Sequence, residues 1–269
     1  MKPVAALAFV LMALTTGDAL AQDYPVRSIR ILSPYSPGGI SDIAARIVAG
    51  KLTEAWGQQV IVENRPGGNG FIAVTDAARA TPDGYTLVMA TAGDVTINPS
   101  LFKNVPYDVE RDLAPVSAVS DAPLVLAANG ETPYKTLADV IAAAKAQPGM
   151  LNIGTPGYGS INHLVLESIS LNTGTRFVHV PYKGGAPAVQ ALVAGDIPLA
   201  IIASSTAAPH VSSGKIRILG ITTGERSPLN PEWPPLAEEG AGDINVSNWT
   251  ALLGPKAIPQ PIIRSCRPR

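Results

Sequence analysis

At three places in the chain, an apolar run typical of a buried strand leads through a glycine-rich turn into apolar residues at helical spacing. Glycine lets a ligand approach the backbone closely, and a helix start offers unpaired N–H groups and a partial positive charge. In the first unit, Ser41 or Asp42 is placed to cap the helix. A chain built from such strand–turn–helix units is restricted to α/β folds. The helix start of each unit suits a carboxylate or phosphate. The three turns are Pro37-Gly38-Gly39, residues 155–160 and Lys183-Gly184-Gly185.

The other segments alternate in the same way. Strands are expected at 29–34, 60–63, 85–90, 116–120, 124–127, 151–154, 178–182, 199–203, 216–222 and 249–253. Helices are expected at 41–54, 70–79, 137–146, 160–172, 187–194 and 206–213. Strands separated by helices predict parallel sheets with helices on both faces. Ligands of such sheets bind at the carboxyl edge of the strands, where all three glycine turns fall.

The chain divides into two α/β lobes. Residues 22–121 together with 249–269 are expected to form the first lobe, and residues 122–248 the second, because the strand at 249–253 returns to the first lobe. Two crossings of the chain between lobes make a hinge. A cleft between hinged lobes is a natural place to enclose a small molecule.

The first 21 residues have the pattern of a cleaved export signal. A positive start at Lys2 precedes an apolar run over 4–14, and Ala19 and Ala21 supply the small residues of a cleavage site. No other segment is apolar enough over sufficient length to cross a membrane, so no membrane insertion is expected. With a bacterial-style signal, the expected location is the periplasm.

Composition excludes several functional classes. The net charge of −1 argues against nucleic acid, which rewards a strongly basic face. Cys266 is the single cysteine, and the three histidines form no close metal-ligand pair, so neither a metal nor a cofactor is expected. Charged residues make up only 15% of the chain, so the ligand site need not be highly charged.

A set of ordered motifs from Tyr24 to about Pro259 resembles the periplasmic receptors of tripartite tricarboxylate transporters, the TctC-like or Bug family. The motifs are Tyr24-Pro25, Pro37-Gly38-Gly39 with Asp42, Val62-Glu63-Asn64-Arg65-Pro66-Gly67-Gly68, Pro82-Asp83-Gly84-Tyr85-Thr86-Leu87, Gly157-Tyr158-Gly159-Ser160 with His163-Leu164, Val180-Pro181-Tyr182-Lys183-Gly184-Gly185, Arg226-Ser227-Pro228 and Trp249.

This resemblance implies the two-lobed type II periplasmic binding-protein fold with a hinged interlobe cleft. It also implies a monomeric receptor that captures a small carboxylate and delivers it to membrane permease subunits, or to a signalling partner. In that family, ordered waters and N–H groups of the first glycine turn hold a ligand carboxylate. Carried over to this sequence, the implied ligand-binding residues are Ser36, Gly38, Gly39, Ser41, Thr91, Ala92, Gly157, Ser160, His163, Tyr182, Lys183, Gly184 and Ser204. Pro37 has no N–H and only shapes its turn.

Two departures from the family pattern shape the expectations. Many members carry an Asp near the position of Ile202, and its absence here disfavours an amino-acid ligand, whose ammonium would want an acidic partner. A di- or tricarboxylate or an aromatic acid is expected instead. Family members also continue past Pro259 with helices, whereas residues 262–269 are basic and do not look helical, so a truncated C-terminal part is expected.

Alternative interpretations of the same residues stay open. Ser160 is expected both to cap its helix and to contact the ligand, and His163 either supports the site or contacts the ligand. A hydrolase is disfavoured because Ser160 lacks the Gly-x-Ser-x-Gly context and no acid marks a triad with His163. No enzyme activity is therefore expected. The sequence does not distinguish an uptake receptor from an exported sensor that regulates a partner.

Overall fold

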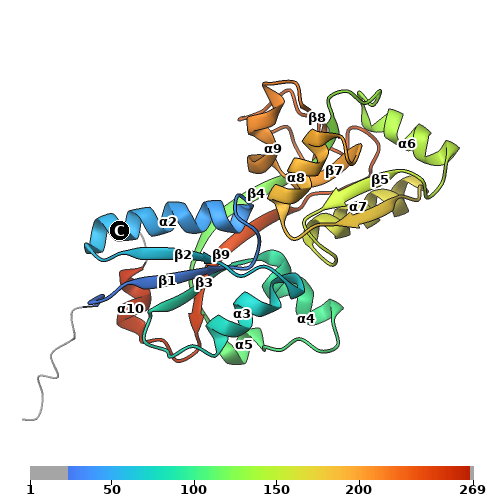
Figure 1. Ribbon diagram of the computed structural model, residues 1–269. Coiled ribbons are helices and arrows are strands. Elements are labelled where there is room, and N and C mark those ends of the chain that lie inside the picture. Colours follow the sequence, from blue (N-terminus) through green and yellow to red (C-terminus); the bar gives the residue numbers. More distant parts are fainter. Residues whose placement is uncertain (1–23, 267–269) are drawn as a thin grey trace, which may run out of the picture.

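The protein, described by a computed structural model over residues 24–266, has two α/β lobes joined by two long strands (Figure 1). The proposed signal at 1–21 lies outside the described residues. The strands are β1 (Ile29–Ser33), β2 (Val60–Asn64), β3 (Thr86–Thr91), β4 (Leu113–Asn129), β5 (Asn152–Thr155), β6 (Val178–Pro181), β7 (Leu199–Ala203), β8 (Ile216–Ile221) and β9 (Ser247–Pro255).

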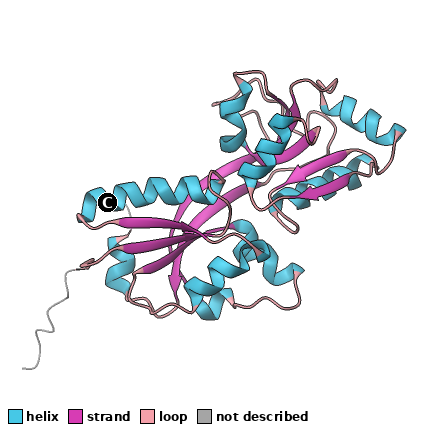
Figure 2. Cartoon of the chain, in the orientation of Figure 1, coloured by secondary structure: helices cyan, strands magenta, loops and turns pink. Residues whose placement is uncertain are grey.

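Helices flank the strands in both lobes (Figure 2). The α-helices are α2 (Ile40–Trp56), α3 (Phe71–Ala78), α4 (Asn98–Leu101), α5 (Val109–Asp112), α6 (Leu137–Ala146), α7 (Ile161–Thr173), α8 (Gly185–Ala194), α9 (Ser204–Val211) and α10 (Gln260–Ser265). Two short helical turns, η1 (Gly68–Gly70) and η2 (Gly93–Ile97), complete the set. Among the helices of residues 24–266, none is long and apolar enough to cross a membrane.

The strands form a mixed sheet, which corrects the expectation of parallel sheets. Strand β1 pairs in parallel with β2 and β3, and β5 pairs in parallel with β6 and β7. Strands β4 and β9 instead run antiparallel to each other and to their neighbours. The parallel parts are the strand–helix–strand units, whereas β4 and β9 carry the chain between the lobes without a helical crossover.

Strand β4 is continuous over 17 residues, whereas the sequence suggested two strands, at 116–120 and 124–127. It pairs with β9 from Leu113 opposite Pro255 to Pro123 opposite Ser247. Pro115 and Pro123 interrupt the apolar pattern and suggested a break. The structure accommodates the interruption with a register shift between Pro115 and Ser117 and another further along the strand. The paired strands β4 and β9 form the connection between the two lobes.

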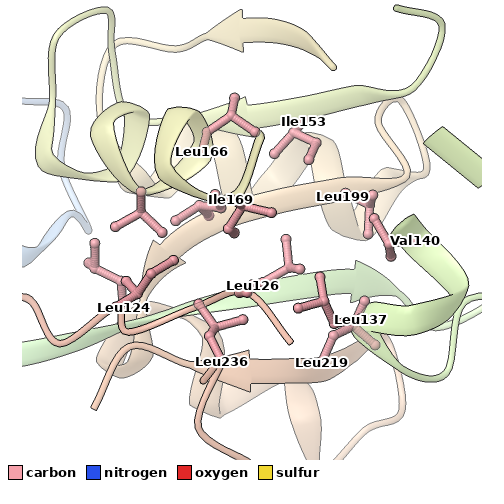
Figure 3. Packing of buried hydrophobic residues seen from close by; sticks show 14 of the residues in the cluster. Leu124, Leu126, Leu137, Val140, Ile153, Leu166, Ile169, Leu199, Leu219 and Leu236 are labelled. Atoms are coloured by element: carbon pink, nitrogen blue, oxygen red, sulfur yellow. The ribbon is translucent and has the colours of Figure 1, made fainter. Parts of the chain in front are cut away.

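Each lobe has its own buried core. In the first lobe, Ile29, Ile31, Leu87 and Met89 pack beneath α2 and α10. In the second lobe, Leu124 and Leu126 of β4 pack with residues of α6, α7 and β7 (Figure 3). Because fully burying one such side chain contributes about 1.5–3 kcal/mol, either cluster supplies tens of kcal/mol against chain entropy.

The C-terminal segment is helical from Gln260 to Ser265, so the expectation of a non-helical end over 262–269 was wrong for residues 262–265. Pro261 suggested a break, but it lies in the first turn of α10, where a helix tolerates proline because that N–H has no intrahelical partner. Ile263 and Cys266 of this segment are buried in the core of the first lobe. Burial raises the pKa of the Cys266 thiol to about 11.

Candidate functional site

The lobes meet at a small cavity that both of them line. It holds about 30 Å³, enough for about two water molecules. Gly39 of the first glycine turn and Ser160 of the second face this same space, which we call the inner cavity. Its lining residues are Tyr35, Gly39, Ile40, Thr91, Gly93, Pro156, Ser160, Ile161, Asn162, Gly185, Ala203, Thr206 and Asn248. None of these described lining residues carries a charged side chain.

Four α-helices of residues 24–266 begin at the inner cavity, and one of them is α9, which starts after Ala203. Helix α2 starts beside Gly39, α7 starts after Ser160, and α8 starts at Gly185. The first N–H groups of a helix have no intrahelical partner, and the macrodipole adds a partial positive charge there. The inner cavity therefore offers main-chain donors from both lobes to a negatively charged group.

The first glycine turn is held in shape by Asp42. Gly38 has φ of +81°, a conformation that favours glycine, and its N–H donates to Asp42 Oδ2 at 2.9 Å. The residue capping α2 is Gly39, which has no side chain, so the expected cap by Ser41 or Asp42 at the helix start is not formed. Asp42 instead reaches back from the first helical turn to the glycine turn. Arg46 pairs with both oxygens of this carboxylate.

Hydrogen bonding to Asp42 links stability to pH. Burial raises the pKa of Asp42, but hydrogen bonds from Arg46, the Gly38 N–H and Asn64 outweigh burial and lower the pKa below its usual value. A lowered carboxyl pKa contributes stability that is present above about pH 4 and is lost as pH falls through the folded-state pKa. We expect Asp42→Asn to lower the free energy of unfolding by about 1 kcal/mol at neutral pH.

Thermal unfolding of wild type and Asp42→Asn between about pH 7 and about pH 3 measures this contribution. The difference between the two proteins should shrink as the solution is acidified. A difference that stays constant down to the lowest pH would mean that the ionised carboxylate does not stabilise the turn.

The second glycine turn ends in the expected cap. The Ser160 hydroxyl accepts from the His163 N–H at 3.2 Å and donates to the Gly157 carbonyl at 2.8 Å. His163 Nδ1 accepts from the Gly159 N–H, and its ring stacks on His179 at 3.9 Å. Burial lowers the pKa of both rings, that of His179 to about 4. The two neutral imidazoles thus brace the turn, and Ser160 bonds the main chain of His163 rather than its ring.

The third glycine turn contacts the first lobe directly. The Lys183 carbonyl accepts from the Ser36 hydroxyl at 2.7 Å and from the Ser36 N–H at 3.2 Å. Gly184 has φ of +125°, and a side chain there would lie 3.2 Å from the Ser36 nitrogen. Glycine at this position therefore permits the two lobes to approach until their main chains hydrogen-bond.

A second, larger cavity lies beside the first, and Tyr35 and Pro156 line both. We call it the outer cavity. It holds about 330 Å³ and is lined by Tyr35, Gly67, Gly68, Asn69, Gly70, Phe71, Phe102, Pro156, Gly157, Tyr158, Pro181, Tyr182 and Lys183. Lys183 is the charged side chain among these described lining residues. The outer cavity is thus aromatic, with one cation at its wall.

The structure distributes the thirteen candidate ligand residues over distinct places. Gly39, Thr91 and Ser160 line the inner cavity, and Gly157, Tyr182 and Lys183 line the outer one. Ser36, Gly38 and Gly184 lie at the contact between the lobes. His163 supports the second turn. Within the described part of the chain, Ser41, Ala92 and Ser204 line neither cavity, and Ser41 bonds Ser33 instead.

Several lining residues were missed by the sequence analysis. Tyr35 lies two residues before the first glycine turn but was not selected, and Asn162 lies in the first turn of α7, where only Ser160 and His163 were considered. Asn162 Nδ2 donates to the Ile201 carbonyl, so its buried Oδ1 is an acceptor and has no partner among the described residues. Asn248 Oδ1 is likewise buried and unpaired within residues 24–266. Both oxygens require a donor such as water or a ligand hydroxyl.

Comparisons with known proteins match this chain to one protein family. Residues 44–267 match the family described as tripartite tricarboxylate transporter family receptor. The protein BugT of Bordetella pertussis is 36% identical over 256 residues, which covers 95% of this chain and 78% of BugT.

Solved structures with bound carboxylates show the same fold. Rpa4515 of R. palustris with adipate is 32% identical, with a TM-score of 0.87 over 90% of this chain and 81% of that one. MatC from Rhodopseudomonas palustris with bound malate is 30% identical, with a TM-score of 0.85 over 90% of this chain and 83% of that one. The two-lobed fold is that of periplasmic binding proteins, as the sequence predicted.

Proposed function

Because this chain belongs to the tripartite tricarboxylate transporter receptor family, we propose that it captures a small organic carboxylate in the periplasm and presents it to the permease subunits of such a transporter. The observation that carries this proposal is the shared inner cavity, where Gly39 of one lobe and Ser160 of the other face the same space. Family and fold are those of solute-binding proteins rather than enzymes.

The inner cavity is too small for a dicarboxylate, so we place water there. Its volume of about 30 Å³ suits waters that bridge one ligand carboxylate to the helix starts of α2, α7 and α8. The body of the ligand would occupy the outer cavity, whose 330 Å³ suits a small organic acid. Tyr35 and Pro156 lie where the two compartments adjoin.

The outer cavity favours particular ligands. Its aromatic side chains, Phe71, Phe102, Tyr158 and Tyr182, suit a methylene chain or an aromatic ring, and Lys183 suits a second carboxylate. Ile202 is fully buried and supplies no carboxylate for an ammonium group. We therefore expect a dicarboxylate, a tricarboxylate or an aromatic acid rather than an amino acid. Bound adipate in Rpa4515 and bound malate in MatC support this class.

Lobe closure would signal that the ligand is bound. Ser36 of the first lobe bonds the Lys183 carbonyl of the second, and this contact between the lobes supports a closed form. In an open form these bonds are exchanged for bonds to water. The permease would then recognise the surface that exists only when both lobes meet. The β4–β9 pair between the lobes is placed to act as the hinge.

Isothermal titration calorimetry tests the proposed ligand class. The panel comprises adipate, L-malate, citrate, benzoate and L-aspartate, and we expect at least one of the first four to bind with a Kd of about 10 µM or tighter and L-aspartate to bind more weakly. Absence of binding by all five acids would contradict the proposal. Uptake of the bound acid by cells with and without this protein would then separate transport from a sensing role.

A further inference from the structure

Asp94 is a buried carboxylate directly behind the inner cavity. The residue is fully buried in η2, immediately after Gly93, which lines that cavity. Its Oδ2 accepts from the Thr91 N–H at 2.7 Å and from the Thr91 hydroxyl at 2.9 Å. Its Oδ1 accepts from the Tyr35 hydroxyl at 3.0 Å. Both hydroxyl residues, Tyr35 and Thr91, line the inner cavity.

These hydrogen bonds set the polarity of the cavity wall. An ionised carboxylate has no proton to donate, so the hydroxyl protons of Tyr35 and Thr91 must both point toward Asp94. Each oxygen then presents only lone pairs to the cavity. Lone pairs repel a carboxylate, and a water that donates one proton to such a lone pair has only its other proton for the ligand. The ionised form of Asp94 therefore opposes the anion that the helix starts attract.

Protonation of Asp94 reverses one of these bonds. Oδ2 already accepts two hydrogen bonds, so the proton is best placed on Oδ1. The new O–H donates to the Tyr35 oxygen, and the Tyr35 hydroxyl proton is freed to turn toward the cavity. One proton is taken up from solvent, it stays on Asp94, and no covalent bond other than this O–H changes.

We propose that Asp94 is a positioning residue that couples capture of the carboxylate to uptake of one proton, with Tyr35 passing the change to the ligand side of the cavity. This inference rests on the proposed function, because it requires a negatively charged ligand. It adds a specific role for a residue that touches no ligand itself.

The surroundings of Asp94 favour such coupling. Burial raises its pKa to about 6, in spite of the hydrogen bonds from Thr91 and Tyr35 that lower it. The titratable groups that face it are the phenols of Tyr35, from the loop after β1, and Tyr107, from the segment after α4; Tyr107 donates to the Asp94 main chain. Gly70 of η1 lies so close that a side chain there would collide with Asp94 Oδ1. Among residues 24–266, no cation offsets the Asp94 charge.

Calorimetry with adipate and L-malate tests the proposal, in buffers of different ionisation enthalpy from about pH 6 to about pH 8. Wild type should take up about half a proton at neutral pH, and its affinity should fall about tenfold across this range. Asp94→Asn mimics the protonated acid, because its amide donates to Tyr35 while its oxygen accepts from Thr91. This variant should take up no proton and keep one affinity throughout.

Two further variants sharpen the test. Asp243→Asn removes an exposed carboxylate and should behave as wild type. Tyr35→Phe should lose most of the proton uptake, because uptake on binding is linked to the affinity change that Tyr35 transmits. It should also bind about tenfold more weakly than wild type at about pH 6, because no hydroxyl is freed.

Distinct outcomes would overturn distinct proposals. If adipate or malate binds to wild type without proton uptake, the coupling is wrong and the receptor function stands, and this measurement holds even if Asp94→Asn does not fold. If Asp94→Asn keeps the wild-type pH slope, the proton resides elsewhere. If Tyr35→Phe binds as wild type does at low pH, Tyr35 is not the relay. If neither acid binds, the inference fails together with the ligand class on which it rests.

Discussion

Replacing Gly39 by valine is expected to abolish carboxylate binding, with a loss of affinity of at least about 100-fold. Gly39 is buried at the inner cavity, and a Cβ there would lie 3.4 Å from the Ser36 carbonyl oxygen and 3.7 Å from the Gly185 nitrogen. The two methyl groups of valine would extend beyond that Cβ. They would fill a space of about 30 Å³ and separate the glycine turns of the two lobes.

The fold of the variant should survive. Gly39 has φ of −79° and ψ of 170°, an extended conformation that valine adopts without strain. Its melting temperature should therefore stay within a few degrees of wild type, because the lobes fold around separate cores. Binding is measured by calorimetry with the acid that wild type binds.

Gly50→Val is the matched control for this prediction. Gly50 lies in α2, the helix that Gly39 caps, and a Cβ there meets nothing within 4 Å. This variant should bind as wild type does. A folded Gly39→Val protein with wild-type affinity would remove the first glycine turn from the ligand site and would leave the inner cavity without a function.

The three strand–turn–helix units are predictable from sequence because each is local. The apolar strand, the glycines and the helical repeat lie within about 20 consecutive residues, so periodicity and turn chemistry both apply. Ser160 shows the strength of such local patterns, since its hydroxyl caps α7 as expected. The meeting of Gly39 and Ser160 at one cavity follows from a second general rule, that ligands gather at the carboxyl edge of parallel strands.

The crossing strands are less predictable because their pairing is not local. Strand β4 pairs with β9 more than a hundred residues later in the chain, and its prolines look like breaks until that partner is known. The same strand leaves the first lobe and enters the second without interruption. Periodicity within a short window carries no information on such a path.

Asp94 escapes sequence analysis for a related reason. A single acidic residue after a strand is usually exposed, and nothing nearby in the sequence marks it as buried. Its burial depends on Tyr35, which is 59 residues away, and on the absence of a side chain at Gly70. The one available signal was its place at the carboxyl end of β3, the edge at which ligands of such sheets bind.

Replacing Leu126 by alanine should lower the free energy of unfolding by about 3 kcal/mol, a larger loss than that expected for Asp42→Asn. Leu126 is 1% exposed, and its strand is paired on both sides, opposite Ile201 of β7 and Gly220 of β8. Truncation leaves a cavity in the core of the second lobe that this rigid central strand cannot close. Urea unfolding followed by circular dichroism measures the change.

The control, Leu171→Ala, changes the same residue type on α7 of the same lobe, where the side chain is 84% exposed, and should cost less than about 0.5 kcal/mol. Ligand affinity below the unfolding transition should be unchanged in Leu126→Ala, because Leu126 lines neither cavity within the described residues. A cost below about 1 kcal/mol would show that the second lobe relaxes around the lost side chain. In that case β4 could bend within the second lobe. The hinge between the lobes would then not be limited to the part of β4 that pairs with β9.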